Sequence, residues 1–213
     1  GLTLPASVKS IGKHAFYNTQ LVSLNLNSTE TIAEEAFANC DRLTTVDLGQ
    51  NITDIGDAAF TDCPLTTINF PATLRSIGSS AFSGTTLTRA EFAPGCVLES
   101  VGERAFVGTA LTTVRFPDGL RTLGARAFEN CVKLTYAELG KNLEQIEDNT
   151  FKGCLALSEI DIPASVKNIG ESAFDSCTGL VIVTLNEGLG SIDKYAFRST
   201  AMSQLTIPAS VTQ

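Results

Sequence analysis

Residues 162–185 read IPASVKNIGESAFDSCTGLVIVTL, and versions of this string recur along the whole chain. The dipeptide Ala-Phe marks eight of the copies, and Thr150-Phe151 takes its place in the remaining one. The phenylalanines follow one another at intervals of 21 to 24 residues and are Phe16, Phe37, Phe60, Phe82, Phe106, Phe128, Phe151, Phe174 and Phe197. Self-similarity with a period of this length indicates a stack of short structural repeats that bury their apolar faces against one another.

An apolar triplet with the spacing L-x-x-L-x-L follows each phenylalanine and predicts a short β-strand. The last two members of the triplet are two residues apart, so both point to one side of a pleated strand while the residue between them points to the other side. One short strand per repeat can satisfy its backbone hydrogen bonds only by pairing with strands of neighbouring repeats. The nine expected strands lie in residues 21–26, 43–48, 65–70, 87–92, 111–116, 134–139, 157–162, 180–185 and 202–207.

A second apolar pair, such as Val166 and Ile169, predicts a second short extended stretch in most repeats. A glycine usually comes next and is interpreted as a turn former, and the interval from this glycine to the phenylalanine leaves room for about one helical turn. Two residues after the phenylalanine lies a column rich in Gly, Asn and Asp, which tolerate left-handed backbone and are typical of the end of a short helix. The column consists of Asn18, Asn39, Asp62, Gly84, Gly108, Asn130, Gly153, Ser176 and Ser199.

The string Ile-Gly-x-x-Ala-Phe-x-x-Cys, found in residues 169–177, resembles the BspA-type leucine-rich repeats of surface proteins from bacteria and some protists. The resemblance covers all nine copies. It implies a leucine-rich-repeat solenoid with a curved parallel β-sheet on one face, and short extended segments with single helical or 3-10 turns on the other. Residues 1–213 are expected to form a single repeat domain of about nine repeats, as a fragment of a longer chain. Neither terminus has the polar character of a solenoid cap, which predicts flanking domains or end-to-end self-association.

The composition narrows the functional classes. Fifteen Lys and Arg against 23 Asp and Glu give a net charge of −8, so we expect no nucleic-acid partner. No apolar run reaches the roughly 18 to 20 residues that span a bilayer, so we expect no membrane insertion. The chain has a single histidine, His14, so a Ser-His-Asp or Cys-His arrangement would have to be built at the end of the solenoid, and no second histidine is present to help bind a metal. We therefore expect no enzyme, no catalytic residue, no cofactor and no metal site.

Five of the six cysteines occupy one column, three residues after the phenylalanine. Threonine takes this position in the other four repeats, which predicts a small half-buried slot that holds free thiols; disulfide bonding between neighbouring coils and metal binding are the alternatives. The five are Cys40, Cys63, Cys131, Cys154 and Cys177. The sixth, Cys96, stands in the longest connection and is expected to be exposed, with intermolecular pairing as its functional alternative.

The outward positions of the strands form the candidate binding surface. Near its middle, three successive predicted strands carry two arginines and a tyrosine, residue types that are over-represented in protein-binding hot spots, with two glutamates beside them. The candidate ligand-binding residues are Arg89, Glu91, Arg115, Tyr136 and Glu138. The alternative is an ordinary polar β-surface, because Thr favours strands and polar cross-strand pairs stabilise them.

These features favour an extracellular recognition or adhesion module, which by resemblance to the family would be secreted or attached to the cell surface. Its partner would be a host or cell-surface macromolecule, either a protein, which we expect first, or a glycan. The exposed sheet face would bind this partner. The alternative is a structural spacer or stalk whose associated ligand site lies in flanking domains.

Overall fold

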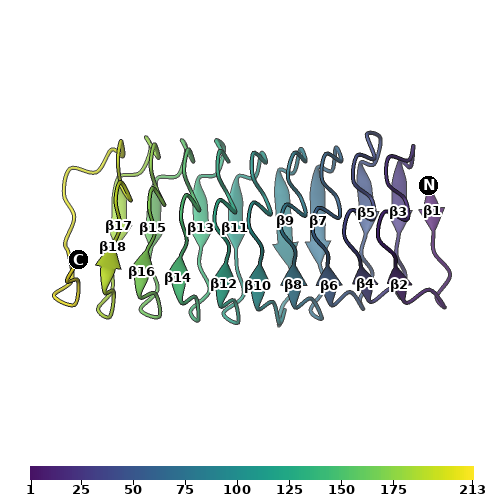
Figure 1. Cartoon of the computed structure of the whole chain (residues 1–213), viewed down its shortest axis with the longest axis horizontal. Coiled ribbons are helices and arrows are strands. Elements are labelled where there is room, and N and C mark those ends of the chain that lie inside the picture. The colour runs from purple at the N-terminus through teal and green to yellow at the C-terminus, as the bar shows by residue number, and fades with distance from the viewer.

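Two rows of short parallel strands define the protein in a computed structural model that describes residues 1–213. Successive coils lie side by side, with the two termini at opposite ends of the row (Figure 1). The first row contains β1 (Leu2–Thr3), β3 (Ser23–Asn25), β5 (Thr45–Asp47), β7 (Thr67–Phe70), β9 (Arg89–Phe92), β11 (Thr113–Arg115), β13 (Tyr136–Glu138), β15 (Glu159–Asp161) and β17 (Ile182–Thr184). The second row contains β2 (Ser10–Ile11), β4 (Thr31–Ile32), β6 (Asp54–Ile55), β8 (Ser76–Ile77), β10 (Ser100–Val101), β12 (Thr122–Leu123), β14 (Gln145–Ile146), β16 (Asn168–Ile169) and β18 (Ser191–Ile192).

Strands pair with the equivalent strands of neighbouring coils, which confirms the predicted solenoid. The first row forms the hydrogen-bonded groups β1-β3-β5, β7-β9 and β11-β13-β15-β17, and the second row forms β2-β4-β6-β8-β10-β12 and β14-β16-β18. Equivalent repeat positions face each other, as with Leu24 opposite Val46 and Ile32 opposite Ile55. One predicted strand is wrong: residues 202–207, in the last coil, form no strand, because their backbone makes no hydrogen bond to β17.

The predicted single helical turns are also wrong, since the structure contains no helix. In their place each coil has consecutive β-turns whose alternate N–H groups donate to the next coil. Around Phe82, for example, the N–H groups of Ser80 and Phe82 donate to the carbonyl oxygens of Glu103 and Ala105, and the donor–acceptor distance is 2.8 Å in both bonds. These N–H groups are then unavailable for the i→i−4 bonds that an α-helix requires. No segment therefore has the length, hydrophobicity and helical form needed to cross a membrane.

Left-handed backbone recurs twice in each coil, once as predicted and once not. The column rich in Gly, Asn and Asp has positive φ in all nine coils, from 54° at Asn18 to 73° at Gly153. A second column, four residues earlier, also has positive φ although it contains no glycine. Its members are His14, Glu35, Ala58, Ser80, Arg104, Arg126, Asn149, Ser172 and Tyr195.

The glycine after the second strand serves a different purpose from the one predicted. Gly78 does not have positive φ, so it is not needed for a left-handed turn. A Cβ atom at this position would lie 2.5 Å from the backbone nitrogen of Asp57 in the preceding coil. The glycine therefore allows two coils to approach closely.

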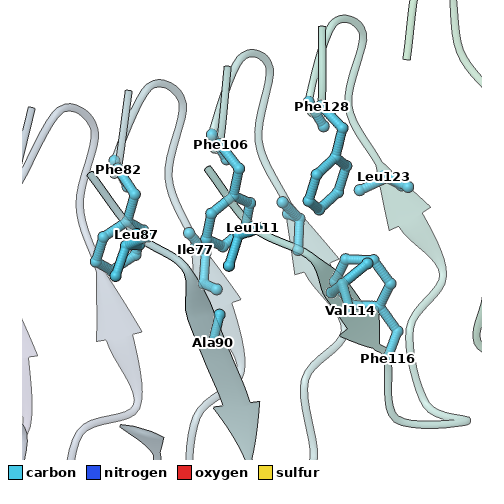
Figure 2. Packing of buried hydrophobic residues seen from close by; sticks show 14 of the residues in the cluster. Ile77, Phe82, Leu87, Ala90, Phe106, Leu111, Val114, Phe116, Leu123 and Phe128 are labelled. Carbon is cyan, nitrogen blue, oxygen red and sulfur yellow. The ribbon is translucent and has the colours of Figure 1, made fainter. Parts of the chain in front are cut away.

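The phenylalanine column is the centre of the core. Phe82, Phe106 and Phe128 lie in a row, at the same place in successive coils (Figure 2). Neighbouring rings in the column are almost parallel and offset, with centroids 5.2 to 5.6 Å apart and interplanar angles of 1° to 13°. The column belongs to one hydrophobic cluster of 56 buried residues that extends from Leu4 to Ala196. The inward orientation of these phenylalanines is confirmed.

All six cysteines are buried free thiols, which confirms the prediction for the five that form a column. Each of those five approaches the carbonyl oxygen of the phenylalanine in the preceding coil; the Cys63 Sγ lies 3.1 Å from the Phe37 oxygen. The prediction for Cys96 is wrong, because its connection turns inward at Ala93 and leaves the side chain only 7% exposed. The adjacent Leu98 is buried too and holds this connection against the core.

Replacing a central ring should strongly destabilise the protein. The fully buried Phe151 lies between Phe128 and Phe174, and we expect Phe151→Ala to cost about 3 to 5 kcal/mol. Chemical denaturation followed by circular dichroism measures the change. Val132→Ala is the control and should cost little, because Val132 is exposed. Equal midpoints for the Phe151 variant and the unmodified protein would contradict this view of the core.

The buried thiols should make the fold sensitive to alkaline pH. Burial raises the pKa of the Cys63 and Cys177 thiols from an ordinary value of 9.0 to about 12, and that of Cys131 to about 11. Above the unfolded pKa the thiols ionise in the unfolded chain while they stay neutral in the folded protein, which favours unfolding. The stability contributed by the buried neutral thiols is therefore fully present below the unfolded pKa and is lost as the pH rises through the folded pKa values. We therefore expect the melting temperature to fall above pH 9.

A triple variant isolates the thiol contribution to this fall. Threonine occupies the same column in other coils, so Cys131→Thr/Cys154→Thr/Cys177→Thr should fold. Its melting temperature should decline less between about pH 9 and about pH 11 than that of the unmodified protein. An identical decline in both would assign the alkaline transition to other groups.

Candidate functional site

The outward positions of the first row are available to solvent, as strand alternation predicts. In β9, Arg89 and Glu91 are exposed while Ala90 between them is buried. In β11, Thr113 and Arg115 are exposed on either side of the buried Val114. In β13, Glu138 is exposed and Tyr136 is half-buried. All five predicted binding residues therefore lie on one face of the solenoid.

The five residues form two separate groups. Within β9, the Arg89 Nε donates to the Glu91 Oε1 over 2.7 Å. Across β11 and β13, the Arg115 Nη1 lies 2.5 Å from the Glu138 Oε2, and its guanidinium carbon lies 4.8 Å from the centre of the Tyr136 ring. The second group follows from the register, which places Arg115 opposite Glu138 and next to Tyr136 on the same face.

Most of the charge of these groups is neutralised within the protein. The hydrogen bond to Glu138 raises the pKa of the Arg115 guanidinium, so this arginine stays charged at any physiological pH. Its side chain remains 67% exposed and that of Glu138 51% exposed. A partner can therefore reach both ends of the ion pair, and the guanidinium is already fixed in position by the ring and the carboxylate.

A groove of about 610 Å³ crosses the outward face of β13, β15 and β17 and extends over the segments that follow these strands. Tyr136 and Glu138 lie at one side of it, Glu159 and Asp161 come from β15, and Ile182 comes from β17. The sequence pattern already showed that β15 and β17 point such residues outward. It did not show that Pro163, Ala164 and Ser165, on the segment after β15, form part of a wall.

The charge of the groove is predominantly negative. Glu138 is paired with Arg115, and the one lysine of the lining, Lys141, lies 2.8 Å from Asp118. Glu159 and Asp161 take part in none of the ion pairs of the protein. The only side chain that donates to Asp161 is the neutral amide of Asn186, over 3.2 Å.

A second, smaller hollow of about 420 Å³ lies beside the segments that follow β9 and β11. Its lining includes Arg115, so it adjoins the Arg115–Glu138 pair, together with Pro94, Cys96 and Pro117. Burial raises the pKa of the Cys96 thiol, which therefore stays protonated and unreactive near neutral pH. This hollow adds shape to the face beside Arg115 and contributes no reactive group of its own.

Neither of the other chemical features considered from the sequence forms a site. His14 is exposed and its Nε2 lies 3.1 Å from the Glu35 carboxylate, at the turn side of the first coil. No three His, Cys, Asp or Glu side chains come close enough together to hold a metal ion. The arrangement on the strand face is suited to non-covalent recognition.

Comparisons with known proteins agree on the repeat type. A family model described as "BspA type Leucine rich repeat region (6 copies)" matches residues 1–96 and 99–213. No curated protein matches the chain. Among solved structures, a leucine-rich repeat protein from Bacteroides ovatus is 26% identical with a TM-score of 0.75, over 99% of this chain and 52% of that one. This chain thus spans about half the length of the Bacteroides ovatus protein.

Two further solved structures have the same architecture. A leucine-rich repeat protein from T. pallidum is 25% identical with a TM-score of 0.59, over 84% of this chain and 77% of that one. The pneumococcal vaccine antigen PcpA is 19% identical with a TM-score of 0.55, over 98% of this chain and 82% of that one. At this level of identity the likeness to PcpA shows the fold alone.

Proposed function

Because the chain belongs to the BspA-type leucine-rich repeat family, we propose that it is an extracellular recognition or adhesion module that binds a protein or glycan through the outward face of its first row of strands. The module would be secreted or displayed on a cell surface, and its partner would be a host or cell-surface macromolecule. The proposed role is binding and not catalysis.

The observation that carries this proposal is the Arg115–Tyr136–Glu138 group on a rigid exposed sheet. The guanidinium is held between a ring at 4.8 Å and a carboxylate at 2.5 Å, so little conformational entropy is lost when a partner contacts it. Arginine and tyrosine are among the residue types that most often dominate binding energy at protein interfaces. Arg89 and Glu91, on the strand beside β11, extend the same surface.

Stacking supports the proposal by keeping the surface in one shape. The strands are only two to four residues long, yet each is held by hydrogen bonds to neighbouring coils and by the continuous core beneath it. A surface that is organised before binding requires less ordering when the complex forms.

A spacer role is the alternative, and the ion pairs favour it in one respect. Arg89 with Glu91, and Arg115 with Glu138, already satisfy each other's charge, as in an ordinary polar β-surface. In that case the rod would hold another domain away from the cell surface. End-to-end self-association also stays a prediction; the half-exposed Ile207 in the last coil would be one of the groups it covers.

A triple variant tests the proposed surface. Arg89→Ala/Arg115→Ala/Tyr136→Ala should abolish capture of extracellular-matrix and cell-surface proteins by the immobilised module. Its melting temperature should change little, because exposed ion pairs contribute little to stability. Capture is measured by pull-down and mass spectrometry.

The matched control removes the same residue types from other faces. Arg75→Ala/Arg121→Ala/Tyr17→Ala also replaces two exposed arginines and an exposed tyrosine, and it should capture as the unmodified protein does. Unaltered capture by the Arg89→Ala/Arg115→Ala/Tyr136→Ala variant would favour the spacer.

A further inference from the structure

The groove over β13, β15 and β17 differs from the rest of the strand face in having two carboxylates without an ion pair on one strand. Elsewhere on the same face Arg89 pairs with Glu91 and Arg115 pairs with Glu138, while Asp47 stands singly and accepts a hydrogen bond from Asn25 over 3.0 Å. In the groove, Glu159 has no ion pair or side-chain hydrogen bond, and Asp161 has only the neutral Asn186. The groove therefore presents two carboxylates that no basic side chain of the protein neutralises.

The spacing of the two carboxylates matches an extended chain. Glu159 and Asp161 stand two residues apart on β15 and point to the same side, so their Cα atoms are about 6.6 Å apart along the strand. Side chains two residues apart on an extended ligand have the same separation. Two basic side chains on one face of such a ligand could therefore meet both carboxylates at once.

The groove also offers an apolar wall for the long stems of basic side chains. Ile182, directly across from Glu159 in the sheet register, lines the groove and is 57% exposed. Lysine and arginine bury their methylene stems along such surfaces while the charged group reaches a carboxylate. Ser165, which also lines the groove, has the only buried side-chain oxygen or nitrogen atom in the protein that makes no hydrogen bond.

From these contacts we infer that the groove binds an extended peptide segment with lysine or arginine at every second position. This inference rests on the proposed function and specifies the chemistry of its partner. The Glu159 and Asp161 carboxylates accept from two basic groups on one face of the segment, and Ile182 packs against their stems. The net charge of −8 on the protein attracts the same partner at longer range.

Fluorescence anisotropy with a labelled peptide of about eight residues, alternating arginine and threonine, tests this inference. The peptide should bind the unmodified protein, and binding should weaken by about threefold or more between about 50 mM and about 300 mM NaCl. A peptide that alternates glutamate and threonine should not bind. Failure of the arginine peptide to bind would overturn the inference.

Two variants locate the binding. Glu159→Gln/Asp161→Asn should weaken the affinity by between about threefold and about twentyfold. The control, Glu99→Gln/Glu144→Gln, changes the net charge equally at exposed carboxylates outside the groove and should change the affinity less than about twofold. Melting temperatures verify that both variants fold. Equal loss in the two variants would show a non-specific charge effect and overturn the groove assignment.

The outcomes separate this inference from the broader proposal. Capture of cell-surface proteins that survives Glu159→Gln/Asp161→Asn, with no peptide binding, would overturn the groove inference and leave the recognition role standing. A second outcome is that the peptide binds, that only Glu159→Gln/Asp161→Asn loses this binding, and that the protein captures no extracellular protein. This outcome would support the groove inference and remove the extracellular role. If neutral hexasaccharides bind in place of the peptide, and the same variant loses this binding, the peptide inference is overturned in favour of a glycan.

Discussion

The backbone of each coil can be satisfied only by the next coil. Strands of two to four residues have too few hydrogen bonds to be stable alone, and the turn that carries the phenylalanine directs alternate N–H groups to its neighbour. The same stacking buries the phenylalanine ring, which lies at the surface of any single coil and becomes fully buried only between two others. Hydrogen bonding and hydrophobic burial therefore depend on one contact and are lost together.

This constraint explains the turn conformation. A helical turn would direct its N–H groups along its own axis, whereas two left-handed residues per coil turn them toward the next coil. Residues such as Glu35 and Arg126 adopt left-handed backbone at an energetic cost that inter-coil hydrogen bonds and ring packing offset. The cysteine slot is part of the same arrangement, since each thiol in it approaches the carbonyl oxygen of the preceding phenylalanine.

The strand face is free to vary because stacking does not depend on it. Its side chains meet their equivalents in adjacent coils, so the character of any region results from three or four neighbouring repeats. At β11 and β13 the neighbours are an arginine and the tyrosine and glutamate that it contacts. At β13 and β15 the register places Tyr136 opposite Glu159, and the segments after the strands complete a groove around Glu159 and Asp161.

Periodicity alone was sufficient to predict the solenoid, the inward phenylalanines, eight of nine strands in the first row and the outward orientation of Arg89, Arg115 and Tyr136, because each depends on spacing within one repeat. The helical turns and the exposed Cys96 were predicted wrongly. The first depends on where N–H groups find acceptors in another coil, and the second on how a long connection folds back onto the core. Only the tertiary structure decided three features: the separation of the five candidate residues into two groups, the unpaired charges of Glu159 and Asp161, and the groove around them. The reason is that distances between side chains of different coils depend on register and on loop paths that no single repeat encodes.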